Sequence, residues 1–314
     1  MSEHGLPAAT AMSAAGPGRA PAGRANIDYV VITAATAGGG HRPNDDAIGV
    51  NGWVLTAEDV NPLDLTVPVV DHRAAVVSLT DGLAGAAGGD VAAAVAARRL
   101  TARQTQRSAT AEAFREAFRQ ADELVHEAST DDLPGIGCSA AAVLIRADGR
   151  AFVGNVGDVR LYQILNGYIG RLTRDDRART EEGPSGADRV VTRCLGGRLR
   201  IPVEVHFTEI PVLPGDRLLL CSDGLYDTVS DSEIEQALKA QRPGHAIAGL
   251  VKAAKSRGGG NITVVLLEPR GRSVRGPAPV LTPQPSPQPS PEPPPQPELA
   301  SAEKTSFLKK LLRG

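Results

Sequence analysis

Residues 217–225, RLLLCSDGL, end a run of apolar residues in an acid and a glycine. The same pattern occurs earlier, where residues 74–82, AAVVSLTDG, lead from apolar residues into Asp81-Gly82. A single Asp-Gly pair most often marks a solvated turn, because both residues are favoured there. Two such pairs, each directly after a strand-like run, indicate that the chain delivers two carboxylates, Asp81 and Asp223, to one place.

The composition predicts a globular, cytoplasmic protein and gives no sign of a nucleic-acid partner. Of the 314 residues, 41% are hydrophobic and only 3% are aromatic, so the core must consist mostly of Ala, Val, Leu and Ile. The net charge is −2, whereas nucleic-acid-binding domains are usually basic. Three widely spaced cysteines favour a reduced cytoplasmic protein over a disulfide scaffold. No stretch approaches the ~20 apolar residues of a membrane-spanning helix, and we expect no secretion signal.

The chain divides into four segments by composition. Residues 1–25 are rich in Ala, Gly and Pro and are predicted to be disordered. Residues 26–270 carry strand and helix signals without a long gap and are predicted to form one domain. Residues 271–302 are a Pro-rich linker, and residues 303–314 form a short amphipathic basic tail. We expect this tail either to dock a partner or to be a frayed end without function, because so short a helix is marginal alone.

The pattern within residues 26–270 predicts an α+β fold. Strand-like runs occur at residues 29–33, 53–56, 74–79, 140–145, 151–156, 160–165, 203–210, 217–221 and 262–267. Four helices are predicted. The first begins at Asp90 and has Val91, Ala94 and Val95 on its apolar face, and the second has its apolar residues between Phe114 and Val125, including Leu124. The third follows the capping box Ser230–Glu233, and the fourth includes Ile247–Ala254. Because strands and helices do not alternate as βαβ units, we expect a four-layer αββα sandwich, with two antiparallel sheets face to face and helices outside.

Further acids lie at the ends of predicted strands. Asp45 and Asp46 precede the apolar residues Ala47 and Ile48, and Asp158 lies between two strand-like runs. Hard cations such as Mg²⁺ and Mn²⁺ prefer oxygen ligands and retain waters, so a few carboxylates from different strands can hold them. Each acid alone is most often a turn or cap residue, but the whole series in this order is far more specific. The series predicts a divalent metal site.

These segments, in this order, resemble the metal-dependent protein serine/threonine phosphatases of type 2C. Residues 44–47, NDDA, are similar to the family's Asn-Glu-Asp-Ala, and residues 80–90 are similar to its Asp-Gly-Met-Gly-Gly segment and the helix start behind it. Residues 157–160, GDVR, resemble Gly-Asp-Ser-Arg, and residues 214–225 are nearly identical to the family pattern. The resemblance covers roughly residues 26–268 and implies the sandwich fold of that family.

The resemblance also implies a reaction and two metal ions. The reaction is hydrolysis of phosphoserine or phosphothreonine by attack of a metal-bound hydroxide, and the substrate is a phosphorylated protein, the product of a serine/threonine kinase. The two ions are Mn²⁺ or Mg²⁺. Asp81 would bridge them, with the Gly82 carbonyl on the first ion and Asp223 on the second.

The remaining site residues follow from the same resemblance. Asp45 and Asp46 would hold waters bound to the metals, and Asp158 together with Asp223 would form a weaker third metal site. The family's phosphate-binding arginine usually lies four residues before its first acid, where this chain has His41, so Arg42 is the candidate for that role.

This chain departs from the family pattern at several positions. Gly260 stands where the family has the last metal-binding aspartate, and Asp45 is one methylene shorter than the usual glutamate. Leu83 cannot act as a leaving-group acid, and the segment between Arg174 and Arg189 is short for a substrate-side flap. We expect an active phosphatase that needs high metal concentrations. The alternative is a pseudophosphatase of the same fold that binds a kinase or a phosphoprotein.

A cysteine phosphatase is a second alternative. Cys194 and Arg200 have the Cys-x5-Arg spacing of that class, but Arg193 stands where such enzymes have histidine. We therefore expect Cys194 to be a core-facing cysteine.

Overall fold

The computed structural model describes most of the predicted domain, namely residues 26–39, 44–56, 62–70, 73–83, 88–165, 167–179, 189–240 and 242–271. The segment 1–25, the tail 303–314 and all of the linker except Gly271 lie outside the described residues. The predictions for those segments therefore stay predictions.

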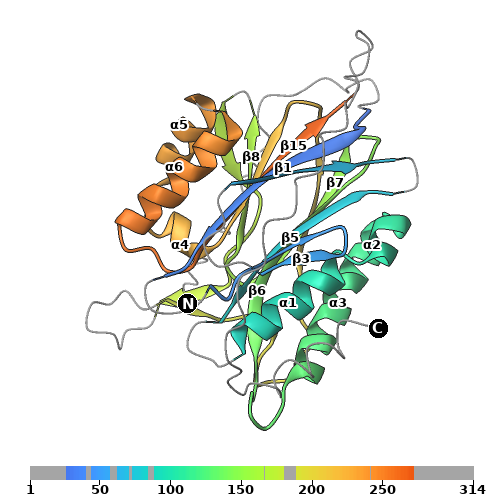
Figure 1. The fold of residues 1–314 in the computed structure, drawn as a ribbon. Coiled ribbons are helices and arrows are strands. Elements are labelled where there is room, and N and C mark those ends of the chain that lie inside the picture. Colours follow the sequence, from blue (N-terminus) through green and yellow to red (C-terminus); the bar gives the residue numbers. More distant parts are fainter. Residues whose placement is uncertain are drawn as a thin grey trace, which may run out of the picture. The chain divides into compact units, whose positions relative to one another are not determined.

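Two antiparallel sheets form the centre of the fold (Figure 1). The first sheet has the strand order β4 (Leu63–Pro68), β1 (Tyr29–Ala37), β15 (Ile262–Arg270), β14 (Arg217–Cys221), β8 (Arg160–Leu165) and β9 (Tyr168–Arg171). The second has the order β13 (His206–Pro211), β7 (Arg150–Val156), β6 (Gly137–Ile145), β5 (Ala75–Gly82), β2 (Ala47–Val50) and β3 (Trp53–Leu55), with β12 (Leu195–Gly196) paired to β6. Strands β10 (Arg177–Arg179) and β11 (Arg189–Val191) form a separate pair.

The two sheets pack face to face because alternate side chains of each strand point into a shared core. Val77 on β5 and Leu220 on β14 belong to this inner core, whereas their neighbours Val76 and Leu219 belong to the cores beneath the helices. Strands buried on both faces have continuous apolar sequences, which is why these runs were visible in the sequence.

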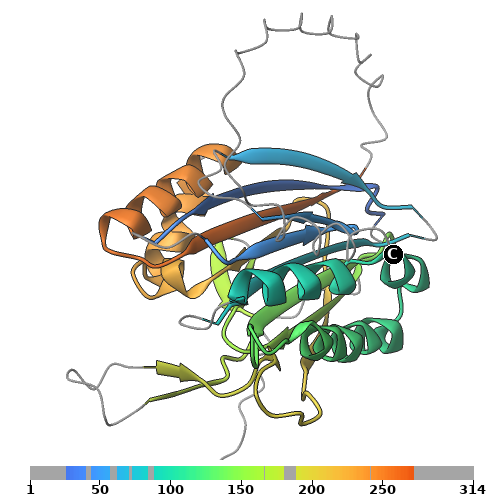
Figure 2. The same cartoon turned by 60° about the horizontal axis from the view of Figure 1, so that its bottom comes forward.

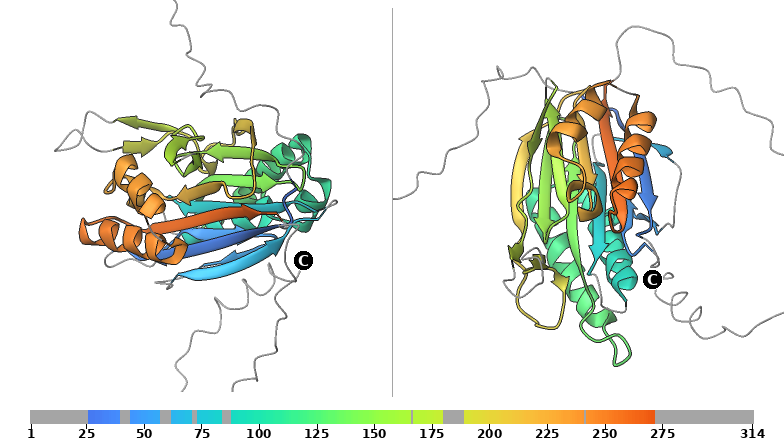
Figure 3. Two further views of the ribbon diagram at one scale, coloured as in Figure 1. Left: turned by 90° about the horizontal axis from the view of Figure 1, so that it is seen from above. Right: turned by 90° about the vertical axis from the view of Figure 1, so that its left-hand side faces the viewer.

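Helices cover the outer face of each sheet (Figures 2 and 3). Helices α1 (Gly89–Leu100), α2 (Arg103–Ser108) and α3 (Ala111–Ala128) lie on the second sheet, and α4 (Asp223–Tyr226), α5 (Asp231–Ala240) and α6 (Pro243–Ser256) lie on the first. The predicted αββα sandwich is confirmed. None of the helices in the described part of the chain has the length and apolar character needed to cross a bilayer.

The predicted helices lie at the expected positions, but some of the residues predicted to be buried on them are not buried. The capping box before α5 is confirmed, since the Ser230 amide donates to Glu233 at 3.0 Å. Helix α1 buries a row of four alanines, while Val91 and Val95 are only partly buried. Leu124 on α3 is 38% exposed, so its predicted burial was wrong. Small alanines allow α1 to lie close to the sheet, so the face of α1 that packs on the sheet is the alanine face and not the face with Val91 and Val95.

Candidate functional site

The two Asp-Gly pairs lie at or just after the ends of strands that belong to different sheets. Asp81 and Gly82 are the last residues of β5, and Asp223 begins α4 after β14. A Cβ atom on Gly82 would lie 2.6 Å from the carbonyl carbon of Gly89, and one on Gly224 would lie 2.3 Å from the Asn261 carbonyl oxygen. Each acid is therefore followed by glycine because another backbone segment passes directly against it.

The other three predicted acids come from the same end of the sandwich. Asp45 and Asp46 immediately precede β2, and Asp158 lies in the turn between β7 and β8. Gly157 in that turn has a φ of 87°, a conformation that favours glycine. Asp46 and Asp158 are each only 3% exposed.

The charges of the five aspartates act on one another. The pKa of Asp81 is raised well above its ordinary value, first by burial and then by the negative charges of Asp46, Asp223, Asp158 and Asp45. Burial also raises the pKa of Asp46 to about 7 and that of Asp223 to about 6. Such shifts arise when carboxylates are brought together away from water, so the structure gathers all five predicted acids into one cluster.

Asp46 is fixed by hydroxyl groups on one side only. Its Oδ2 accepts hydrogen bonds from Thr263 Oγ1 at 2.5 Å and Ser222 Oγ at 3.1 Å, and its backbone amide donates to Asn44 Oδ1 at 2.8 Å. Its Oδ1 is buried and has no hydrogen-bond partner among the described residues. A buried carboxylate oxygen of this kind can serve as a ligand for a cation or for a water that the cation holds.

A hard divalent cation fits this donor set, because the five side chains offer only carboxylate oxygens. No three of the described Asp, Glu, His or Cys side chains lie close enough together to enclose an ion as they stand. Mg²⁺ and Mn²⁺ normally keep several bound waters, so waters can complete the coordination sphere where the carboxylates do not reach the ion directly.

Asn261 and the two hydroxyl residues were not predicted as site residues. Asn261 Nδ2 donates to Asp45 Oδ1, and its own Oδ1 accepts from the Gly39 amide at 2.9 Å. Ser222 directly precedes Asp223, and Asn261 and Thr263 follow Gly260 within three residues. Their hydrogen-bonding side chains beside expected ligands were the signal that could have identified them.

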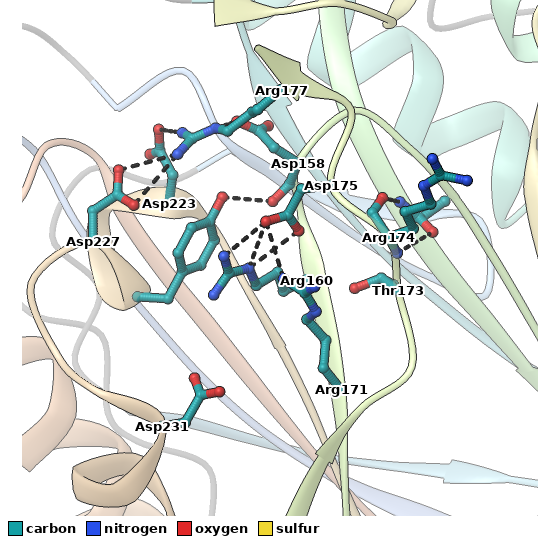
Figure 4. A network of polar contacts seen from close by, with 12 residues as sticks. Asp158, Arg160, Arg171, Thr173, Arg174, Asp175, Arg177, Asp223, Asp227 and Asp231 are labelled. Atoms are coloured by element: carbon teal, nitrogen blue, oxygen red, sulfur yellow. Dashed lines mark hydrogen bonds and ion pairs between the residues drawn. The ribbon is translucent and has the colours of Figure 1, made fainter. Parts of the chain in front are cut away.

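Arg177 is a site residue that was not expected from the sequence (Figure 4). Its guanidinium group pairs with Asp158 through Nε and with Asp223 through Nη2, and it lies 3.2 Å from Asp227. Arg177 begins β10, in the segment expected to be a shortened flap, and no sequence pattern singled it out. Figures 2 and 3 show that the β10–β11 pair projects beyond the two sheets.

Two predicted positions need separate mention. Gly260 has open space around it, since a Cβ atom added there would meet no atom within 4 Å. Arg42, the candidate phosphate ligand, lies outside the described residues, as does His41.

Cys194 is not suited to nucleophilic catalysis. Burial, followed by the charge of Asp122, raises the pKa of its thiol to about 11. A cysteine nucleophile needs a lowered pKa, because the thiolate is the reactive form. Cys194 is half-buried, so the expectation of a core-facing cysteine holds only in part, but the structure argues against a cysteine phosphatase.

The family model for protein phosphatase 2C matches residues 64–182 of this chain. The chain is 36% identical over 150 residues to the serine/threonine protein phosphatase PstP of Mycobacterium tuberculosis, covering 44% of this chain and 28% of that protein. It is 32% identical over 158 residues to the serine/threonine phosphatase Stp of Listeria monocytogenes, covering 46% of this chain and 62% of that one. The chain therefore spans less than two thirds of these relatives.

Solved structures of similar proteins match over a longer part of the chain. PppA of Pseudomonas aeruginosa has a TM-score of 0.61 and 25% identity, with 78% of this chain and 99% of that one covered. The catalytic domain of PstP, crystallised with two manganese ions, has a TM-score of 0.56 and 26% identity, with 77% of this chain and 100% of that one covered.

Proposed function

Because this chain belongs to the protein phosphatase 2C family, we propose that it hydrolyses phosphoserine and phosphothreonine in proteins with the help of divalent metal ions. The observation that carries the proposal is the cluster of five aspartates, drawn from both sheets, in which the pKa values of Asp46, Asp81 and Asp223 are raised. Such a cluster is costly without a cation, and its oxygens are the ligands that Mg²⁺ and Mn²⁺ prefer.

The metal ligands in this proposal are those that the sequence indicated. Asp81 and the Gly82 carbonyl would hold Mn²⁺ or Mg²⁺, with Asp223 toward a second ion and Asp158 toward a weaker third one. Asp45 and Asp46 would hold their waters. When bound, such ions activate water and neutralise the charge of a phosphoryl group.

The chain's own residues supply a proton acceptor beside the metal ligands. Asp46 has one oxygen held by Ser222 and Thr263 and a second, Oδ1, without a partner among the described residues. Its pKa of about 7 allows Oδ1 to take a proton from an attacking water near neutral pH. Arg42 would bind the phosphate group of the substrate, since its guanidinium can contact two phosphate oxygens at once.

The substrate class follows from the family, and the cellular setting from composition. We propose a phosphorylated protein, made by a serine/threonine kinase, as the substrate and the cytoplasm as the location. The basic tail, residues 303–314, would dock a partner.

Hydrolysis of a phosphothreonine peptide tests the proposal. Phosphate release should require Mn²⁺ or Mg²⁺, stop on addition of EDTA, and be lost in Asp81→Ala. Full activity in EDTA, or an unchanged rate in Asp81→Ala, would show that the aspartate cluster is not the catalytic site. Alkylation of the thiols should leave the rate unchanged, whereas a cysteine phosphatase would be inactivated.

Two observations favour the alternative, a pseudophosphatase that binds a kinase or a phosphoprotein. Gly260 supplies no carboxylate, and Arg177 occupies Asp158 and Asp223. Binding of the phosphopeptide without release of phosphate at any Mn²⁺ concentration would establish this alternative.

A further inference from the structure

Arg177 places a fixed positive charge at one end of the aspartate cluster. Its guanidinium group contacts Asp158, Asp223 and Asp227, and only 10% of its side chain is exposed (Figure 4). Asp158 is nearly buried, with 4% of its side chain exposed. The side chains of Asp223 and Asp227 are 39% and 37% exposed, so the charge-assisted contact with Asp158 is the one that is stronger than an ion pair on the surface.

The backbone that carries Arg177 is held in place by the preceding residue. The Asp176 amide donates to the Gly157 carbonyl at 2.8 Å, and the Gly157 amide donates back to Asp176 Oδ2 at 3.0 Å. The second oxygen of Asp176 contacts His206 Nε2 at 2.8 Å. Since Gly157 immediately precedes Asp158, this clamp fixes Arg177 relative to its first partner.

An aromatic ring flanks the guanidinium group. The ring centroid of Tyr226 lies 5.5 Å from Arg177 Cζ, within the range of a cation–π interaction. The Tyr226 hydroxyl donates to the Asp158 carbonyl oxygen at 2.7 Å, and Arg160 lies over the same ring at 3.6 Å. The position of Arg177 is thus built by several elements and does not depend on a single surface contact.

A second divalent ion would have to bind the same two carboxylates that Arg177 already uses. Asp158 Oδ2 and Asp223 Oδ2 both accept from its guanidinium group. Gly260 contributes no carboxylate that could attract an ion to this end in preference to the arginine. An ion bound to the same two carboxylates would lie close to the guanidinium group, and the repulsion between the two positive charges lowers the affinity of this end for that ion.

We propose that Arg177 is the resident cation at the Asp158–Asp223 end of the site, where it takes the place of a second metal ion. The chain then binds one divalent ion tightly, at Asp81, and a further ion only when Arg177 is displaced or removed. This inference rests on the proposed metal-dependent function, since it concerns the ions that the same cluster would bind.

The number of Mn²⁺ ions bound per chain tests the inference. Equilibrium dialysis and titration calorimetry on the full chain should give a single tight ion for the native sequence. Arg177→Gln, which removes the charge but keeps much of the volume, should bind an additional ion. Arg177→Lys keeps a cation and should retain the native count. The matched control is Arg171→Gln, which removes an arginine that pairs with Asp175 at 3.1 Å in the same network and should also keep the native count.

Two results would overturn the inference. Two tightly bound ions in the native chain would show that Arg177 does not exclude the second one. An unchanged count in a folded Arg177→Gln would show the same. The thermal transition in EDTA shows whether Arg177→Gln folds. If it does not fold, the number of Mn²⁺ ions bound by the native chain still tests the inference.

Phosphate release from a phosphothreonine peptide, measured on the same samples, separates this inference from the proposed function. A rise from one ion to two without hydrolysis in any sample supports the role of Arg177 and contradicts the phosphatase. Metal-dependent hydrolysis with equal ion counts supports the phosphatase and contradicts the role of Arg177.

Discussion

At one end of the aspartate cluster, Asp46 and Asp81 have no ion pair with any described basic residue, whereas at the other end Asp158 and Asp223 share Arg177. We call these the open end and the arginine end. At the open end, burial and mutual repulsion raise the pKa values of Asp46 and Asp81, so a bound cation would stabilise the ionised carboxylates there. The arginine end has a cation of its own. Two groups of the same residue type, a few strands apart, thus differ in how much they need a metal.

The largest expected effect separates the two ends directly. Asp81→Asn should reduce Mn²⁺-dependent phosphate release by about three orders of magnitude or more, because it removes the central ligand of the open end. Asp223→Asn should cost clearly less, because Arg177 and Asp158 still define the arginine end. Steady-state rates at saturating Mn²⁺ measure both. Equal losses would erase the distinction between the ends.

A smaller effect should follow from loosening the open end alone. Thr263→Val removes the hydroxyl that donates to Asp46 Oδ2 at 2.5 Å, and we expect Mn²⁺ affinity to fall about 10- to 100-fold. Thr33→Val is the matched control, since it removes a Thr–Asp hydrogen bond of 2.6 Å, to Asp64, outside the cluster. Calorimetric titration with Mn²⁺ compares the two. A similar loss in both variants would mean that general destabilisation, and not the support of Asp46, is being measured.

Adding a carboxylate at Gly260 should strengthen metal binding, in contrast to the preceding substitutions, which weaken it. Gly260→Asp should lower the Mn²⁺ concentration for half-maximal activity about tenfold, since the new ligand would help an ion to compete with Arg177. The open space around Gly260 leaves room for the side chain. Gly244→Asp, equally unobstructed but in the first turn of α6, is the control and should have no effect. If neither activity nor binding heat changes, position 260 does not face the metals.

The smallest expected effect is the pH dependence of the metal-free protein. The folded-state pKa of Asp46, about 7, lies above its unfolded value of 3.8, so the native state binds more protons between these values. The free energy of unfolding should therefore be highest below about pH 4 with respect to this group and should fall by on the order of 1–3 kcal/mol as pH rises through 7. Thermal unfolding in EDTA at pH 5.5 and 8 measures the change, and Mn²⁺ should reverse it.

Single substitutions assign this pH dependence to one end. Asp46→Asn should flatten it more than Asp223→Asn, because Arg177 offsets part of the repulsion at Asp223. A steeper pH dependence in Asp46→Asn than in the native chain would contradict the assignment.

Much of the fold could be predicted from local pattern. The long strands β5, β6, β7, β14 and β15 are buried on both faces and therefore read as continuous apolar runs. The short strands β2, β4, β9, β10 and β11 and the short helices α2 and α4 were not predicted. A strand or helix of few residues gives too little periodicity to stand out, and the sheet edge β4 alternates exposed and partly buried residues.

The sequence by itself determined where the carboxylates would be. Each Asp-Gly pair ends an apolar strand, and the physical reason is local: the strand is buried, and the glycine admits a neighbouring backbone. The missing acid at Gly260 was equally plain in the sequence.

Only the tertiary structure decided how those charges are balanced. Arg177 meets Asp158 and Asp223 from 19 and 46 residues away, and Thr263 reaches Asp46 across 217 residues. A long, flexible arginine has no periodic signature, so its partners depend on the Asp176–Gly157 clamp and on where the two sheets bring their strand ends together.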